Sequence, residues 1–153
     1  MKHEILLLGK TKDNYLRKGI DEFTGRLGHY TNFTISTLKE KNPGKSSNPV
    51  DAQGDVLLGA VQAGAMKIVL DSRGKQLSSE KFADQITRWE MNGVKHICYL
   101  IGGPEGHAQK VIDQADMLLS FSKMTFTHDM IRLLLVEQLY RAYTIKAGEK
   151  YHK

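Results

Sequence analysis

The chain has 153 residues, of which 41% are hydrophobic and 25% charged, and its formal net charge is +5. This composition argues against intrinsic disorder, and the length suits one hydrophobic core, so we expect a single domain over residues 1–153. The sequence holds no apolar run of the roughly 20 residues that span a bilayer, so we expect no membrane partner, and its lone cysteine fits a reducing, cytoplasmic location.

The amino-terminal part predicts a strand, a helix and a second strand. Residues 4–9 (EILLLG) begin with a charged Glu4 and precede no small-residue cleavage site, which indicates a strand rather than a signal peptide. Apolar residues at helical spacing predict a helix over residues 14–30 that ends near Gly28. Alternating apolar and hydroxyl residues predict a half-buried strand over residues 33–38.

A long loop and a weak helix come next. Residues 39–49 hold two of the three prolines together with Gly, Ser and Asn, which predicts a loop. Residues 50–65 predict a helix that two internal glycines weaken. Residues 66–71 (MKIVLD) predict a short buried strand, and the following SRGKQL predicts a turn.

The sequence patterns that predict secondary structure are clearer in the second half of the chain. Residues 78–93 predict an amphipathic helix with Ser78 as its N-cap and Gly93 as its stop. Residues 95–101 predict a buried strand that runs into a loop, residues 102–106, with three glycines and a proline in five positions. Such a loop lets another group approach the main chain closely.

The last third of the chain predicts a short helix over residues 108–115, a strand over 116–122 and a long helix over 129–148. No repeat or linker interrupts this alternation of strands and helices. We therefore predict an α/β fold with a largely parallel sheet flanked by helices.

The long last helix is apolar around most of its circumference. Glu137, Gln138 and Arg141 occupy one narrow polar sector, and Arg132 stands alone nearly opposite Arg141. A helix of this kind needs burial on more than one side, which favours a homodimer. The alternative is that the helix is central in its own fold.

Three strand exits carry small or polar loops, at residues 70–75, 101–106 and 120–126. Ligands of open α/β sheets bind beyond the carboxyl ends of strands, so these three loops together can form the walls of one cleft. Each loop alone is more typical of a simple turn. None matches a Walker loop or a dinucleotide fingerprint. The six histidines show no paired ligand spacing and Cys98 has no cysteine partner, so we expect no metal site.

Basic residues gather in two places. These clusters are typical of a surface for RNA phosphates, although ordinary solvated lysines explain them equally well. Their members are Lys39, Lys41 and Lys45 in the long loop, and Lys146, Lys150, His152 and Lys153 at the carboxyl end.

Several stretches in fixed order carry a family resemblance, namely ILLLGK, IGGPEG, LSFSKMTF, RLLLVEQLYRAY and the terminal YHK. With them the chain resembles, over its full length, the bacterial ribosomal large-subunit pseudouridine methyltransferase H family of the SPOUT class. One departure is Thr127, where relatives commonly have a proline. The resemblance implies an α/β-knot fold, in which the C-terminal segment forms a trefoil knot.

The resemblance also implies an activity. Its members act as homodimers that use S-adenosylmethionine to methylate N3 of a pseudouridine in 23S rRNA of the assembled 70S ribosome. Carried over to this chain, the expected cofactor contacts are Leu70, Gly102, Phe121, Ser122, Lys123, Met124, Thr125 and Phe126.

The acceptor N3–H must lose a proton, so a general base is useful. His152 on the basic tail is the first candidate, followed by Glu137 and His128, and Arg132 is a candidate for the substrate phosphate or the edge of the cofactor pocket. The alternatives without a catalytic role are a solvated His152, a Glu137–Arg141 ion pair and a buried structural ion pair at Arg132.

Tyr151, Lys150 and Lys153 are expected to contact RNA, by stacking on a base and by pairing with phosphates. Two other functions stay open at this point. One is a non-catalytic RNA- or nucleotide-binding module, and the other is a related SPOUT enzyme that acts on tRNA.

Overall fold

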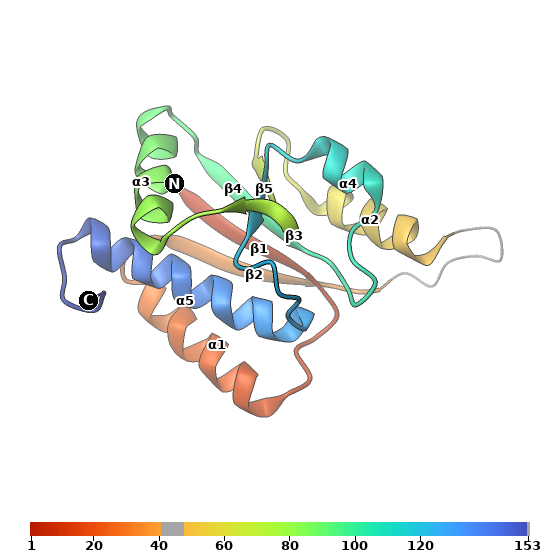
Figure 1. The fold of residues 1–153 in the computed structure, drawn as a ribbon, viewed down its shortest axis with the longest axis horizontal. Helices are drawn as coiled ribbons and strands as arrows, with labels where there is room; N and C mark the ends of the chain where they lie inside the picture. The colour runs from red at the N-terminus through yellow and green to blue at the C-terminus, as the bar shows by residue number, and fades with distance from the viewer. Residues whose placement is uncertain (41–47, 153) are drawn as a thin grey trace.

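The computed structural model describes residues 1–40 and 48–152, and its centre is a five-stranded sheet in the order β2-β1-β4-β3-β5 (Figure 1). All neighbouring strands run parallel, which confirms the predicted α/β class and parallel sheet. The strands are β1 (Lys2–Leu8), β2 (Asn32–Leu38), β3 (Met66–Gln76), β4 (His96–Ile101) and β5 (Met117–Ser120). The threading of the carboxyl-terminal segment into a knot stays a prediction.

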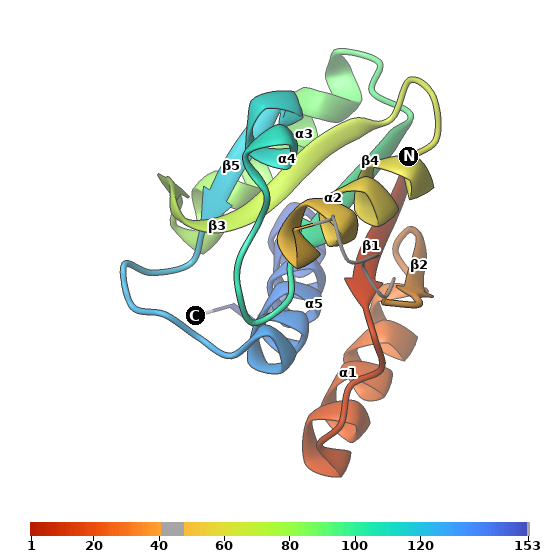
Figure 2. The same cartoon turned by 90° about the vertical axis from the view of Figure 1, so that its right-hand side faces the viewer.

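Five helices cover the two faces of the sheet (Figures 1 and 2). They are α1 (Asn14–Leu27), α2 (Pro49–Ala60), α3 (Ser79–Met91), α4 (Gln109–Gln114) and α5 (His128–Lys146). Helices α1, α3 and α5 pack with the larger hydrophobic core on one face, and α2 and α4 pack with a smaller core on the other. In the part of the chain that the structure describes, no helix is long and apolar enough to span a bilayer.

The helix starts follow the capping residues in the sequence. The hydroxyl of Ser78 accepts a hydrogen bond from the backbone N–H of Lys81 and begins α3 as predicted. Thr127 does the same for α5, where its hydroxyl accepts from the N–H of Met130 at 3.2 Å. The threonine that the sequence analysis noted as a departure thus serves as an N-cap.

Two expected boundaries are wrong. The predicted turn after residue 71 is strand, because β3 continues to Gln76 and pairs again with β5 after a register shift between Leu70 and Lys75. The main chain of Gly74 runs so close to Leu118 that an added Cβ would lie 2.6 Å from its carbonyl carbon. The helix predicted over residues 50–65 ends at Ala60.

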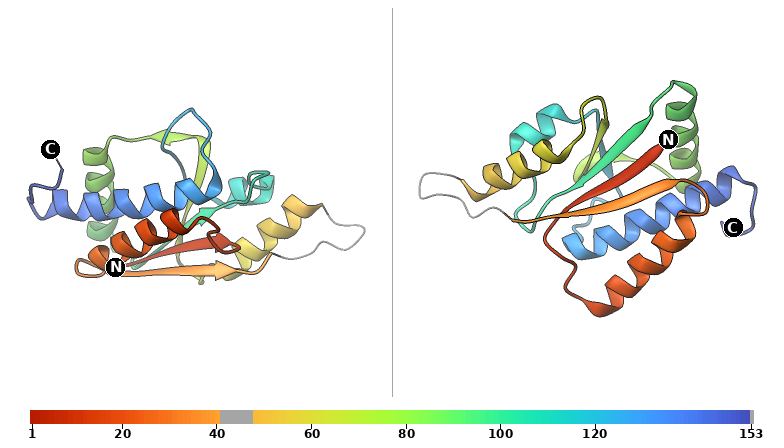
Figure 3. Two further views of the ribbon diagram at one scale, coloured as in Figure 1. Left: turned by 90° about the horizontal axis from the view of Figure 1, so that it is seen from below. Right: turned by 180° about the vertical axis from the view of Figure 1, so that it is seen from behind.

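Helix α5 lies side by side with α1 on the sheet (Figure 3). It packs between α1 and α3 and against β4, and Gly19 of α1 gives room to the side chain of Leu133. The chain's own fold therefore buries much of the apolar surface of α5. Several of its apolar side chains stay only partly buried, among them Met130, Ile131, Leu134 and Tyr140.

Candidate active site

A cavity of about 570 Å³ opens beside residues 70–72 in the middle of β3 and at the carboxyl ends of β4 and β5. Its walls are this part of β3 and the loops that follow β4 and β5, so the structure brings together residues of the three segments that the sequence analysis singled out, although the first of them is strand and not a loop. Seven of the eight predicted cofactor residues line it: Leu70, Gly102, Phe121, Ser122, Met124, Thr125 and Phe126. Lys123 lies in the same loop and is exposed, but it is not among the lining residues.

The glycine-rich loop presents main chain to this cavity. Gly103 and Gly106 form an antiparallel bridge that folds the loop back on itself, and Gly106 has a φ of +81°. An added Cβ on Gly102 would lie 3.2 Å from the ring of His107 and 3.3 Å from the carbonyl carbon of Gly106. A side chain at Gly102 therefore has little space between the loop and the histidine.

His107 joins two walls of the cavity, and the sequence analysis did not select it. Its Nε2 lies 3.1 Å from the carbonyl oxygen of Leu70, so Nε2 carries the proton and donates. Burial lowers the pKa of His107 more than Asp71 and two backbone carbonyls raise it, which keeps the ring neutral. Its Nδ1 is buried and has no hydrogen-bond partner among the described residues, so it is an acceptor left unused in this part of the structure.

The loop between β5 and α5 is held by its own hydroxyl groups. The hydroxyl of Ser120 donates to the carbonyl of Ser122 at 2.8 Å, and the N–H of Met124 donates to the hydroxyl of Ser122 at 3.0 Å. Met124 and Phe126 nevertheless keep 75% and 37% of their surface exposed. This wall of the cavity is thus an ordered loop with apolar side chains facing solvent.

The charge of the cavity limits what it can bind. Its described lining contains no lysine or arginine, and its titratable members are Asp71, His107 and His128. The side chain of Arg73 donates to Asp71 at 2.9 Å and lowers the pKa of that carboxyl despite partial burial. Such a lining does not suit a diphosphate or triphosphate, and it fits a ligand with apolar, neutral polar and cationic parts.

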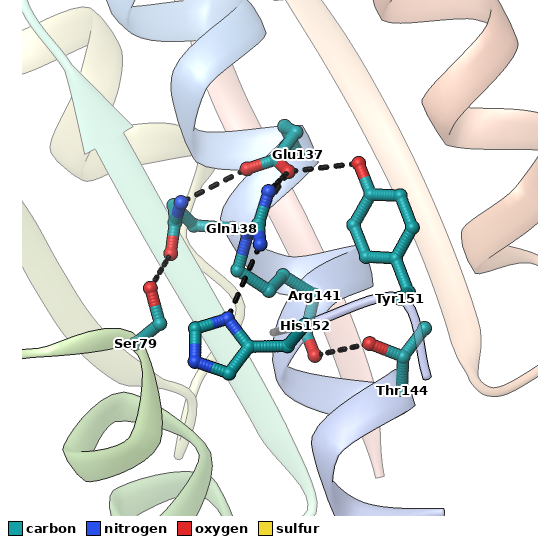
Figure 4. Close-up of polar contacts among 7 residues, drawn as sticks. All are labelled: Ser79, Glu137, Gln138, Arg141, Thr144, Tyr151 and His152. Atoms are coloured by element: carbon teal, nitrogen blue, oxygen red, sulfur yellow. Dashed lines mark hydrogen bonds and ion pairs between the residues drawn. The ribbon is translucent and has the colours of Figure 1, made fainter. Parts of the chain in front are cut away.

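A polar network outside this cavity holds the carboxyl-terminal tail (Figure 4). The carboxylate of Glu137 accepts from Arg141 Nε at 3.1 Å and from the Tyr151 hydroxyl at 2.9 Å. Nδ1 of His152 lies 3.2 Å from Arg141, and its Nε2 lies 2.8 Å from Glu80 Oε1. Because arginine only donates, Nδ1 accepts here and Nε2–H donates to Glu80.

The structure does not bring His152 or Glu137 to the cavity of the same chain, since neither is among the described lining residues. A second hollow of about 390 Å³ lies between the two places. It shares Phe121 and Phe126 with the cavity and is also lined by Gln138, a member of the tail network. Of the base candidates, only His128 lines the cavity directly.

Arg132 is almost fully buried, at 1% exposure. It donates to the carbonyl of Leu8 at 2.8 Å and to the Thr11 hydroxyl at 3.0 Å, and it pairs with Asp129 at 3.3 Å. Burial lowers the pKa of the guanidinium, and the Asp129 carboxylate opposes this. Arg132 is therefore in the buried structural ion pair with Asp129, and it is not among the described residues that line the cavity.

The expected RNA contacts lie around the tail. Lys150 is exposed, whereas the ring of Tyr151 packs edge-on against Tyr140 and lies 4.8 Å from the Arg141 guanidinium. Stacking of Tyr151 on a base requires release of these contacts. Lys153, Lys41 and Lys45 lie outside the described residues.

Comparisons with known proteins give a matching family model and full-length relatives. A family model described as "Predicted SPOUT methyltransferase" matches residues 1–152. The chain is 56% identical over 153 residues to "Ribosomal RNA large subunit methyltransferase H" of Desulfotalea psychrophila, and 43% identical over 159 residues to the protein of that name from Halothermothrix orenii. Both matches cover 100% of each chain.

A solved structure supports the fold alone. It is titled "The structure of a probable methylase family protein from Haemophilus influenzae Rd KW20" and aligns with a TM-score of 0.59 at 11% sequence identity. The alignment covers 99% of this chain and 70% of the other.

Proposed function

The chain belongs to the SPOUT methyltransferase family, and from this membership we propose that it transfers a methyl group from S-adenosylmethionine to N3 of a pseudouridine in 23S rRNA of the assembled ribosome. The observation that carries the proposal is the cavity between the middle of β3 and the ends of β4 and β5, where seven of the residues expected to contact the cofactor meet. The close full-length relatives named for rRNA methylation support the substrate class.

The cavity fits the expected cofactor by its chemistry. The apolar side chains of Leu70, Ile101 and Leu119 offer an apolar surface, and Gly102 and Gly103 line the cavity without side chains. The buried, unpartnered Nδ1 of His107 can accept a hydrogen bond. The bound cofactor supplies a methyl group already activated on a sulfonium, so the residues of the chain have only to place the acceptor and take its proton.

Positioning is then the larger part of the catalysis. Holding two reactants in attack geometry can lower a barrier by about 7–11 kcal/mol. The loop between β5 and α5, with its internal hydrogen bonds at Ser122, forms a fixed wall against which the acceptor can be aligned.

His152 is the proposed general base. Its Nδ1 accepts from Arg141, so the lone pair of the neutral ring becomes free to remove the N3 proton when the tail releases this hydrogen bond and moves to the substrate. Glu80 accepts from Nε2–H and would stabilise the charge that the ring gains, as a carboxylate does for a catalytic histidine. Glu137 holds Arg141 and Tyr151 and is proposed as a positioning residue.

His152 does not line the cavity of its own chain, so we place it over the cavity of a second subunit. In this homodimer each cavity is completed by the tail of the other chain, and the second hollow beside Phe121 and Phe126 is part of the contact. Exposed Met124 and Phe126 would be covered in the same way.

Recognition of RNA would use the same tail. Lys150 and Lys153 would contact phosphates, and Tyr151 would stack on a base after release from Tyr140. A net charge of +5 gives modest affinity for free RNA, so we propose that the shape of the ribosome around the target supplies the remaining recognition.

The experiment is methyl transfer in vitro. Ribosomes and tRNA from cells that lack this protein are incubated with the purified chain and labelled S-adenosylmethionine, and the 23S rRNA is analysed by mass spectrometry. We expect one methyl group on a pseudouridine of 23S rRNA in ribosomes. Labelled tRNA with unlabelled ribosomes would identify a tRNA enzyme, and RNA binding without calorimetric heat from the cofactor would identify a binding module.

A further inference from the structure

A cluster of three metal-ligand side chains lies at the opposite end of the sheet from the cavity. Glu4 lies in β1, and His96 and Cys98 lie at the start of β4. Residues two apart on a strand share a face, and the parallel register pairs Glu4 with Cys98, so all three side chains point to one place. This convergence depends on strand pairing and leaves no ligand spacing in the sequence.

We propose that Glu4, His96 and Cys98 bind one zinc-class transition-metal ion. The three donor atoms lie within 4.8 Å of one another. Bond lengths of zinc to sulfur and nitrogen in a tetrahedron place those two ligands about 3.5 Å apart. Cys98 Sγ lies 3.5 Å from His96 Nε2.

The carboxylate also lies near the tetrahedral positions. A zinc-bound oxygen lies about 3.3 Å from the nitrogen ligand and about 3.6 Å from the sulfur ligand. Glu4 Oε2 lies 2.9 Å from His96 Nε2 and 3.9 Å from Cys98 Sγ, so shifts of a few tenths of an ångström are enough. On binding, the thiol proton leaves to solvent and the ion takes the place of the hydrogen bond between His96 and Glu4.

The surroundings include one group that favours such an ion and one that opposes it: Lys2 Nζ lies 3.7 Å from Glu4 Oε2 and has to turn toward solvent when the ion binds. The hydroxyl of Ser36 donates to Glu4 Oε1 at 2.7 Å and fixes the carboxylate from outside the ligand set. Cys98 is fully buried, while the side chains of Glu4 and His96 are 12% and 13% exposed, so solvent reaches the cluster from one side. A water molecule can take the fourth position.

The donor set also selects the metal. Calcium and magnesium prefer oxygen ligands, whereas a thiolate, an imidazole and a carboxylate together favour zinc or its neighbours. The ion would join β1 to β4 through side chains, so it would stabilise the fold rather than take part in methyl transfer. Its stabilisation would follow from binding to the folded chain and not to the unfolded one.

The test uses the untagged full-length chain freed of metal with a chelator. Cobalt(II), a spectroscopic substitute for zinc, is titrated in, and zinc is then added in competition with a chromophoric chelator. We expect one equivalent per chain, a thiolate-to-cobalt charge-transfer band that zinc abolishes, and a higher melting temperature with zinc.

The variants Cys98→Ser and His96→Gln should lose the band and weaken zinc binding at least a hundredfold. His29→Gln, which changes an exposed histidine elsewhere, is the matched control and should bind as the parent does. Circular dichroism shows whether each variant folds, and His96→Gln serves if Cys98→Ser does not. Absence of a bound equivalent, or equal zinc binding by the parent and His96→Gln, would overturn the proposal.

Discussion

The two neighbours of His152 fix the tautomer of its neutral ring. Arg141 can only donate to Nδ1, so the ring proton lies on Nε2 beside Glu80. We expect His152→Ala to lower the turnover number by about 10²–10⁴-fold, the usual contribution of a general base, while calorimetry shows unchanged affinity for S-adenosylmethionine. The exposed His29 is the matched position, and His29→Ala should keep full turnover. Unchanged turnover in His152→Ala would remove His152 as the base.

Gly102 tests the cavity without touching the tail. A Cβ at this position already meets the ring of His107 at 3.2 Å, so the branched side chain of Gly102→Val must enter the cavity or push the histidine away. We expect at least a tenfold loss of S-adenosylmethionine affinity by calorimetry. Gly59→Ala adds a methyl group where no atom lies within 4 Å and is the control. Normal binding by Gly102→Val would mean that the cofactor lies elsewhere.

His3 makes the stability of the fold depend on pH. Its ring is fully buried between the hydroxyl groups of Tyr99 and Tyr143, and burial, with help from Lys146, lowers its pKa from 6.5 to about 3. The unfolded chain therefore binds the proton first, so stability is full above pH 6.5 and falls as the pH drops toward 3. At pH 5 we expect a loss of about 2 kcal/mol relative to neutral pH.

The measurement is urea unfolding of the parent and two variants at pH 7 and pH 5. His3→Gln should lose this part of the pH dependence, whatever its stability at pH 7, whereas exposed His29→Gln should keep it. The same pH dependence in His3→Gln and the parent would show that other groups cause the acid sensitivity.

At the scale of elements, the close contact between β3 and β5 depends on Gly74. A Cβ there would lie 2.6 Å from the carbonyl carbon and 2.7 Å from the oxygen of Leu118, and neither backbone can yield without opening the strand pair. We expect Gly74→Ala to reduce the free energy of unfolding by about 2–4 kcal/mol in urea titrations. Gly59→Ala, in the open part of α2, should raise it by up to about 1 kcal/mol. Equal stability of the two variants would contradict this account of Gly74.

The elements that the sequence predicts correctly are those whose signals are local. The apolar spacing and the Ser78 cap of α3 lie within a few residues of one another, and the prediction of α3 is confirmed within two residues. The extension of β3 was missed because SRGK has the composition of a turn, and only pairing with β5, more than 40 residues away, makes it a strand. In this segment, pairing with another strand outweighs the preference of the residues for a turn.

In the candidate site, too, some features follow from the sequence and others depend on long-range contacts. A general rule for parallel sheets predicts from the sequence that the three segments lie together, and seven predicted residues line the cavity. The partners of His152 in the tail were not predictable, because Glu80 lies 72 residues away in α3. The pairing of Glu4 with Cys98 likewise depends on the register of β1 against β4.

For the whole molecule, the decisive question is whether one chain's tail serves another chain's cavity. His152→Ala keeps its cavity, and Gly102→Val keeps its tail, so neither homodimer has a complete site. When equal amounts of the two variants exchange subunits, half of the dimers are mixed, and each mixed dimer has one complete site of two.

We therefore expect methyl transfer to ribosomes to recover to about a quarter of the parent rate after mixing. Sedimentation velocity confirms that dimers are present, and each variant kept alone through the same exchange is the control. If every tail closed over its own cavity, no mixture would recover activity, because each chain would still lack one half of its site. Recovery thus separates a shared site from a self-contained one, and failure with intact dimers would leave His152 acting within its own chain or not at all.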